Sequence, residues 1–269
     1  MRRPAFLPPR RPVVSVVALS GVIAAGARGG LSMETVGPVL ARAFRKRGTT
    51  AVALRLNSPG GSPVQSSLIG AAIRRLADET GLPVHAFVED VAASGGYWLA
   101  AAADDVWVDD SSITGSIGVI SAGFGFVEAL NKLGVERRVH TAGTDKSMLD
   151  PFRPERAEDV ARLHALQGRV HAAFIAHVRA RRGDRLDEGR DLFTGEIFVG
   201  RDAVDAGLAD GVGHLVPRMK ALYGDKVRFR ALGRRRPLLA RLVPGLAAAA
   251  AEGAAAALEE RAMRARLGL

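Results

Sequence analysis

A serine among small residues is the first group in this sequence that could bond covalently to a substrate. Ser94 lies in the stretch Val91–Tyr97, which reads VAASGGY. The stretch predicts a helix beginning at this serine, where the positive end of the helix dipole would favour charge developing on the hydroxyl oxygen. Ala92 stands where a Gly-x-Ser-x-Gly nucleophile elbow has its first glycine, so the stretch departs from that motif. Ser94 is a candidate nucleophile, and an ordinary helix cap is the alternative.

A pair of glycines follows a short apolar strand and could supply donors for a developing negative charge. The stretch Asn57–Gly61 reads NSPGG and comes directly after the predicted strand 51–56. Adjacent glycines let the backbone turn its N–H groups outward, which is the arrangement that holds an oxyanion. The alternative is an ordinary tight turn.

Lys146 is one of few lysines in a chain whose basic residues are mostly arginine. The lysines are at positions 46, 132, 146, 220 and 226. Because arginine stays protonated in proteins, a lysine is the residue to consider for base chemistry. Lys146 lies in the stretch Gly143–Met148 and would need burial to lose its charge at working pH. A solvent-facing charge is the alternative.

Other nucleophiles and metal ligands are less well supported. The chain has no cysteine, and none of its six histidines stands in a motif that suggests a Ser-His-Asp triad. The histidines do not pair with carboxylates at metal-ligand spacing. We therefore expect neither a metal nor another cofactor.

The net charge of +10 raises the question of an anionic partner. No nucleic-acid motif accompanies the charge, and an aromatic content of 5% argues against a platform for stacking bases, so we expect no nucleic-acid partner. Arginines gather near the end of the chain, at positions 228, 230, 234, 235, 236 and 241. A solvated tail is one interpretation of this cluster, and a peripheral membrane contact is the other.

Alternating strands and helices predict an α/β fold with a largely parallel sheet. The predicted strands are 13–19, 51–56, 83–88, 106–108, 117–120 and 136–140. The predicted helices are 34–47, a helix directly after Gly61, 94–103, 126–133 and 154–182. Ser62 suits the N-cap of the second helix, Pro63 its first position, and Gln65 would complete a capping box.

The two ends of the chain differ in composition from its middle. Residues 1–12 form a basic lead, and the apolar stretch Val13–Ala25 lacks a signal-peptide cleavage site and is too short to span a bilayer as a helix. Residues 226–269 form an Arg/Ala-rich extension that includes the alanine-rich run Leu246–Leu258. We therefore expect one domain at 13–225 and a cytoplasmic or membrane-peripheral location.

Together these motifs resemble those of the signal peptide peptidase A family, whose fold is related to ClpP and crotonase. The matching stretches, in chain order, are Asn57–Gly61, Ala93–Tyr97, Thr114–Val119, Lys146 and the string from Gly200 to Asp210. The resemblance covers roughly residues 13 to 225. Many family members carry an N-terminal membrane anchor, whereas this chain begins almost directly at its first predicted strand.

The resemblance implies a serine endopeptidase with a serine–lysine dyad. Ser94 would attack the scissile carbonyl and form an acyl-enzyme, and Lys146 would remove its proton and later activate water. Ser116 would hydrogen-bond the lysine amine, and the amides of Gly61 and Gly95 would stabilise the oxyanion. The resemblance implies no cofactor.

Extended peptides, such as remnant signal peptides, are the substrates that the resemblance implies. It also implies a ring-like homo-oligomer, in which the serine and the lysine can come from neighbouring subunits. Two other functions stay open: a crotonase-like acyl-CoA enzyme, and a non-catalytic scaffold or membrane-organising protein of the same fold. Having both Ser94 and Lys146 favours the peptidase, because neither alternative needs the pair.

Overall fold

The computed structural model describes residues 11–26, 30–143, 145–233 and 261. The chain divides into two units. The first comprises Met1–Ile117 and Ile175–Leu269, and the second comprises Gly118–Phe174.

One sheet of eight strands forms the centre of the first unit as far as it is described. The main path of the sheet is β6-β5-β3-β2-β1-β8, and β4 and β7 branch off from β3. All pairs are parallel except β5 with β6. The strands are β1 (Val13–Ser20), β2 (Ala51–Ser58), β3 (Val84–Ala93), β4 (Asp105–Val108), β5 (Ile113–Gly115), β6 (Ile197–Val199), β7 (Gly211–Val212) and β8 (Arg228–Leu232). This mixed architecture with a largely parallel sheet confirms the predicted fold class.

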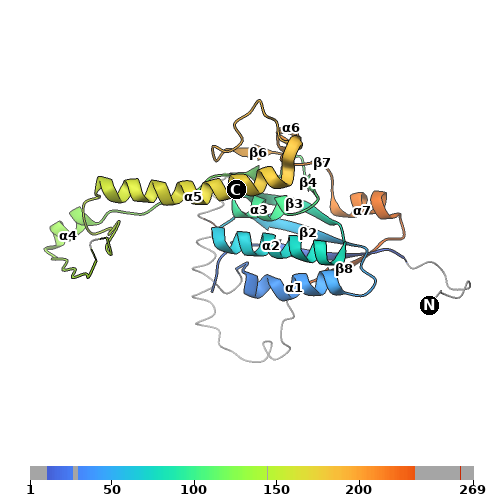
Figure 1. Cartoon of the computed structure of the whole chain (residues 1–269), viewed down its shortest axis with the longest axis horizontal. Coiled ribbons are helices and arrows are strands. Elements are labelled where there is room, and N and C mark those ends of the chain that lie inside the picture. Colours follow the sequence, from blue (N-terminus) through green and yellow to red (C-terminus); the bar gives the residue numbers. More distant parts are fainter. Residues whose placement is uncertain (1–10, 27–29, 144, 234–260, 262–269) are drawn as a thin grey trace, which may run out of the picture. The chain divides into compact units, whose positions relative to one another are not determined.

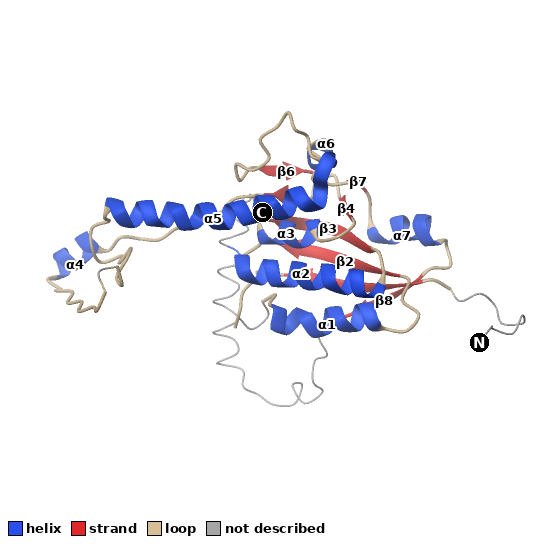
Figure 2. Cartoon of the chain, viewed as in Figure 1, coloured by secondary structure: helices blue, strands red, loops and turns tan. Residues whose placement is uncertain are grey.

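Helices cover the sheet on both faces. Those that lie wholly in the first unit are α1 (Met33–Arg45), α2 (Pro63–Thr80), α3 (Gly95–Ala101), the short 3₁₀ helix η1 (Gly183–Arg185), α6 (Arg201–Asp205) and α7 (Leu215–Tyr223). In Figures 1 and 2, α1, α2 and α3 lie next to one another across one face of the strands. On the other face, Met219 of α7 packs against Val14, Ala53 and Phe87 of the sheet.

The alternation of side chains along β2 explains the two layers. Leu54 and Leu56 are fully buried, whereas Arg55 between them is exposed. Successive side chains of a strand point to opposite faces. Leu54 and Leu56 therefore lie on one buried face of β2, and Arg55 lies on the other face. The same alternation on β1 buries Val17 and Leu19 and exposes Ala18.

The start of α2 follows the sequence prediction with one correction. Ser62 Oγ accepts a hydrogen bond from the Gln65 N–H at 3.4 Å, and Pro63 begins the helix. The Gln65 side chain does not close the predicted capping box, because its Oε1 accepts a hydrogen bond from the Met33 N–H at 2.8 Å. Gln65 therefore ties the start of α2 to the start of α1, a tertiary contact that the local pattern could not reveal.

β3 changes partners along its length. Its residues His85–Phe87 pair with β4, and its residues Val91–Ala93 pair with β5. Between these segments the register against β2 shifts at a bulge that faces Leu56 and Ser58. Because a bulge bends its strand, this one allows the end of β3 to join β5 after its start has paired with β4.

Two predicted strands are wrong. Residues 117–120 form no strand, and the strand of this region is β5, at 113–115. Residues 136–140 form no strand either. β5 is a buried three-residue strand, too short to show an alternating pattern, so the neighbouring run of apolar residues was the stronger but misleading signal.

The second unit contains α4 (Val127–Leu133) and the first part of α5 (Ala157–Arg182), whose residues from 175 on belong to the first unit. None of the residues of α4 is buried. Ion pairs hold this unit locally: Arg137 Nε lies 2.9 Å from Asp150 Oδ2, and Arg156 Nη2 lies 2.7 Å from Asp159 Oδ1.

The end of the described chain belongs to the sheet. β8 lies within the predicted extension 226–269 and pairs in parallel with β1. The alanine-rich run Leu246–Leu258 and residues 1–10 of the basic lead lie outside the described residues. The domain boundaries stay a prediction.

Candidate active site

Ser94 occupies a strained turn between the end of β3 and the start of α3. Its backbone angles are φ 52° and ψ −122°. A positive φ is uncommon for residues other than glycine. The Ser94 N–H donates to the Gly115 carbonyl oxygen at 2.8 Å, and the Ser94 carbonyl accepts from the Trp98 N–H at 3.0 Å. The side chain makes no capping hydrogen bond and is half-buried, so the structure does not support the simple helix-cap alternative.

Gly60 lies against this turn so closely that only glycine fits. Its φ is +102°, and a Cβ added there would lie 2.8 Å from the Gly95 nitrogen and 2.9 Å from Ser94 Cβ. Such distances are below ordinary van der Waals contact, so the missing side chain is what lets the two segments approach. The glycine pair and the serine turn therefore form one site, although Ser94 lies 33 positions after Gly61 in the chain.

The Gly61 amide nitrogen lies beside this site. Ile23 donates its N–H to the Gly60 carbonyl at 2.8 Å and accepts from the Ser62 N–H at 2.7 Å. In such a parallel bridge the intervening residue presents its own N–H on the opposite side, away from Ile23. The Gly61 nitrogen is 3.4 Å from the point where a Cβ on Gly95 would lie.

Two neighbouring amides at this point lack protein acceptors. Among the described residues, neither the Gly61 N–H nor the Gly95 N–H donates a hydrogen bond to another group of the protein. Gly95 is the first residue of α3, where helical N–H groups have no partner within the helix. The pair could together bind an oxygen that carries negative charge.

Ser116 lies beside the serine turn. Ala93 and Gly115 are paired in the parallel ladder of β3 and β5, and Ser94 and Ser116 directly follow them. The two serines therefore leave neighbouring strands at the same level. Ser116 also has a positive φ, of 50°, and its N–H donates to the Glu196 carbonyl at 2.7 Å.

Two residues that the sequence analysis missed, Ile23 and Ser66, support the site together with Asn57 of the glycine-pair motif. Asn57 Nδ2 donates to Asp90 Oδ2 at 2.6 Å, across the bulge in β3. Ser66 Oγ is buried against Gly95 and donates to the Ser62 carbonyl at 2.9 Å. Ile23 holds the glycine pair as described. Only Ser66 had a local signal, its position one helical turn after the Ser62 cap.

Lys146 belongs to the second unit, whereas the other predicted site residues belong to the first. Its side chain is exposed, and its N–H donates to the Gly143 carbonyl at 3.4 Å in a turn. The neighbouring Asp145 forms an ion pair with Arg162 of α5. The pairing of Lys146 with Ser94 stays a prediction.

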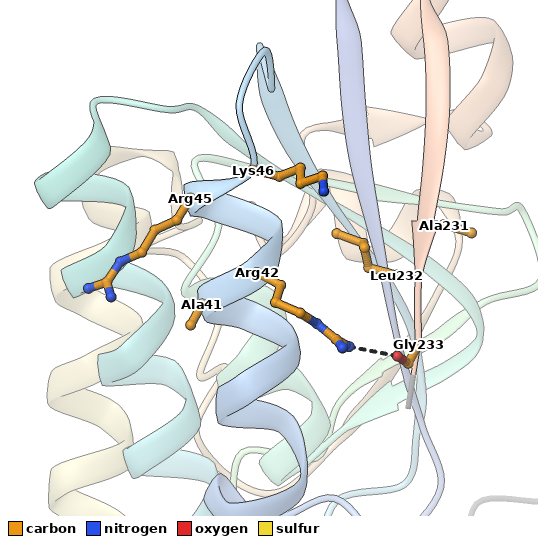
Figure 3. A pocket seen from close by; sticks show the side chains of 7 residues that line it. All are labelled: Ala41, Arg42, Arg45, Lys46, Ala231, Leu232 and Gly233. Carbon is orange, nitrogen blue, oxygen red and sulfur yellow. Dashed lines mark hydrogen bonds between the residues drawn. The ribbon is translucent and has the colours of Figure 1, made fainter. Parts of the chain in front are cut away.

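Three hollows on the surface of the first unit do not include Ser94. Figure 3 shows one of about 580 Å³ between α1 and β8, where Arg42 donates to the Gly233 carbonyl at 2.8 Å. A smaller one of about 160 Å³ lies between β1 and α1, and the largest, of about 860 Å³, is beside α7. Within the described ranges, no group of three or more acidic or histidine side chains could hold a metal ion.

The chain matches the model of peptidase family S49 over residues 77–223, which include Ser94, Ser116 and Lys146. A protein of Brucella melitensis, named a Na⁺/H⁺ antiporter, is 47% identical to this chain. The match covers 95% of this chain and 37% of the Brucella protein. The chain thus spans little more than a third of that relative. The chloroplastic serine protease SPPA of Arabidopsis thaliana is 34% identical over 61% of this chain and 24% of its own length.

A solved structure shows the same fold at low sequence identity. It is a mutant of the 1510-N membrane-bound stomatin-specific protease, with a TM-score of 0.50 and 14% identity over 84% of this chain and 99% of its own. Separately, every helix in the described part of the present chain is too short or too polar to cross a membrane.

Proposed function

The chain belongs to peptidase family S49, and on that premise we propose that it is a serine endopeptidase which forms an acyl-enzyme on Ser94. The observation that carries the proposal is the cluster around this residue. A half-buried serine in a strained turn lies beside two amides, of Gly61 and Gly95, that have no acceptor among the described residues. A nucleophile next to unoccupied donors is the arrangement that acyl transfer requires.

The first half of the reaction forms the acyl-enzyme. Ser94 Oγ attacks the scissile carbonyl carbon while its proton passes to Nζ of Lys146, which is exposed in the single chain and has to become buried, by assembly or by substrate, to act as the base. The carbonyl oxygen becomes an oxyanion, and the amides of Gly61 and Gly95 donate hydrogen bonds to it. One such donor lowers the barrier by about 3 kcal/mol. The C–N bond then breaks, and the leaving amine takes the proton from Lys146.

The second half of the reaction is the hydrolysis of this ester. A water molecule gives a proton to Lys146 and attacks the acyl carbon, and the same two amides hold the second oxyanion. The C–Oγ bond breaks, and Ser94 recovers its proton from the lysine. Ser116, which lies next to the serine turn, would accept or donate a hydrogen bond at Nζ and so fix the direction of the amine.

The exposed apolar side chains of the second unit support a proposal about assembly and substrate class. Several large apolar side chains of the second unit are exposed in the single chain: Ile120, Phe124, Leu133, Val135 and Leu166. Exposed apolar groups of this size favour burial against another molecule. We propose that copies of this chain cover them in a ring-like homo-oligomer that admits extended peptides, such as remnant signal peptides, and excludes folded proteins.

The test combines turnover with active-site labelling. Ser94→Ala should lower cleavage of a quenched fluorescent peptide library by at least about a thousandfold and abolish labelling by a fluorophosphonate. Lys146→Arg should do the same, because it keeps the charge but cannot accept a proton. Ser67→Ala, on the exposed side of α2, and Lys132→Arg, in the second unit, are matched controls that should retain both signals.

Full turnover by Lys146→Arg would refute the lysine base. Labelling of Ser94→Ala at the wild-type rate would refute the nucleophile. Sedimentation of each variant must show the wild-type assembly, because a loss of assembly would remove activity for a different reason.

A further inference from the structure

The largest of these three hollows is a groove on the sheet face opposite α1, α2 and α3. It has a volume of about 860 Å³, within the range of ligand-binding sites. Its floor contains Val16 of β1, Phe87 of β3 and Phe229 of β8. One wall is the start of α7, with Val216 and Pro217. We refer to it as the α7 groove.

The α7 groove exists because α7 covers only part of its sheet face. α7 packs over Val14, Ala53 and Val227, near the beginnings of the parallel strands. Val16 and Arg55, two residues further along β1 and β2, point to the same face but line the groove. This face of the sheet therefore continues beyond α7, which covers only the part near the beginnings of the strands.

The charge of the groove is opposite to that of the chain. Its lining has three carboxylates, of Glu89, Asp90 and Asp109, and a single guanidinium, of Arg55. Arg55 Nε lies 3.4 Å from Glu89 Oε1, so one carboxylate is compensated and two remain. His214 Nε2 lies 3.5 Å from Asp109 Oδ2. An acidic rim is notable in a chain with a net charge of +10.

Hydrogen bonds between side chains and backbone hold the acidic edge of the groove in place. Ser112 Oγ donates to the Glu89 carbonyl at 2.5 Å, and the Asp109 N–H donates to Ser112 Oγ at 2.9 Å. The Ser111 N–H donates to Asp109 Oδ1 at 2.9 Å. A ligand would therefore meet a preformed site and would not have to order it.

The groove lies on the same unit as the candidate nucleophile, and one of its lining residues is on β3, the strand that leads into the serine turn. Asp90 lines the groove, and Ser94 follows four residues later on the chain. Four residues of chain can span at most roughly 14 Å, and the bulge in β3 shortens the separation further. An extended peptide would span it with about four residues, so one substrate could occupy both places.

We propose that the α7 groove binds an extended peptide segment that is apolar and positively charged, as a secondary site for substrates of the peptidase. The apolar floor would take the aliphatic or aromatic side chains, and the uncompensated carboxylates would attract lysine or arginine side chains. The proposal rests on the proposed function for its substrate role. Binding at the groove, however, can be measured without turnover.

The experiment uses the full chain with Ser94→Ala, so that peptides bind without being cleaved. The probe is a fluorescent peptide with two lysines followed by leucines, and its binding is measured by anisotropy. Val216→Lys should weaken binding at least about tenfold, because it places a cation in the groove and removes an apolar contact. Leu222→Lys is the matched control on the same helix: Leu222 is 44% exposed, like Val216 at 47%, but does not line the groove.

A second probe, with the lysines replaced by glutamates, should bind at least about tenfold more weakly than the first. Added salt should reduce this difference in affinity between the two peptides, because it screens the charges. The inference is overturned if Val216→Lys binds the lysine peptide as tightly as the parent, or if both peptides bind equally. It is also overturned if Val216→Lys alone changes the sedimentation of the protein, because the groove would then be a contact between copies of the chain. Groove binding without any turnover would refute only the peptidase.

Discussion

At the scale of single residues, the site depends on a glycine that has no side chain. Gly60 leaves the space in which the Ser94 turn and the Gly95 amide approach the glycine pair. Ser94 itself holds a positive φ that its surroundings enforce through hydrogen bonds to Gly115 and Trp98. Such strain is retained where neighbouring structure fixes it, and it keeps the hydroxyl clear of the helix cap.

Gly60→Ala should therefore be more damaging than an equivalent change elsewhere. Gly21 is the control, because its φ of +100° matches the +102° of Gly60, but nothing lies within 4 Å of its added Cβ. Gly21→Ala should cost about 1–2 kcal/mol of unfolding free energy from the left-handed conformation alone. Gly60→Ala should cost a further ~1–3 kcal/mol for crowding and should slow acylation of Ser94.

Urea unfolding of both variants and their labelling rates with a fluorophosphonate measure these effects. Equal losses in the two variants would show that the space beside Ser94 is not limiting. Unchanged labelling of a destabilised Gly60→Ala would show that the glycine matters for folding and not for the site.

At the scale of elements, α3 and the end of α5 are fastened to the segment that precedes β7. The buried Tyr97 of α3 donates its hydroxyl to the Leu208 carbonyl at 2.8 Å. Arg182 of α5 is buried, and its Nη1 lies 2.6 Å from Asp210 Oδ2. The Val106 N–H donates to the same carboxylate oxygen at 2.7 Å. A single carboxylate therefore joins β4, β7 and α5 behind the serine turn.

This carboxylate should make stability fall in acid. Burial alone would raise the pKa of Asp210, but the hydrogen bond and charge of Arg182 outweigh burial and hold the pKa below its ordinary value. A folded-state pKa below the unfolded value stabilises the protein above the unfolded pKa, at about pH 4. That stabilisation is lost as the pH falls from there through the folded-state pKa.

Asp210→Asn should remove this part of the acid dependence, while lowering stability at neutral pH because it leaves Arg182 uncompensated. Thermal melts of the two proteins from pH 7 to pH 3 measure the difference. Parallel curves over that range would mean that Asp210 does not contribute to acid unfolding.

At the scale of the whole molecule, the second unit leaves several large apolar side chains exposed in the single chain. Its α4 has no buried residue, and Leu133 on this helix is 75% exposed. A ring-like assembly would cover such side chains, and it would make activity depend on protein concentration.

Leu133→Asp should therefore shift the assembly toward the monomer in sedimentation velocity, with an assembly constant at least about tenfold weaker. Leu222→Asp, on α7 of the first unit, is the control and should assemble as the wild type does. Activity and assembly should fall together on dilution. If Leu133→Asp assembles normally, α4 is not part of the contact between subunits.

Local patterns of residues were enough to predict the class of the fold and the motifs of the site. The alternation of strands and helices predicted the α/β class, and the Ser62 cap with Pro63 predicted the start of α2. The motifs around Gly61, Ser94 and Ser116 identified a peptidase family, which the family match confirms. Each of these signals is contained in a short stretch of neighbouring residues, so propensity and spacing suffice to read it.

The folded structure shows which of these features lie next to one another in space. Gly61 lies next to Gly95, Ser116 lies beside Ser94, and β8 pairs with β1. In this structure β5 replaces the predicted strand at 117–120, and strands that are distant in sequence form the α7 groove. Strand pairing and close approach join residues far apart in the chain, and their free energy comes from packing and hydrogen bonds that local propensity does not contain.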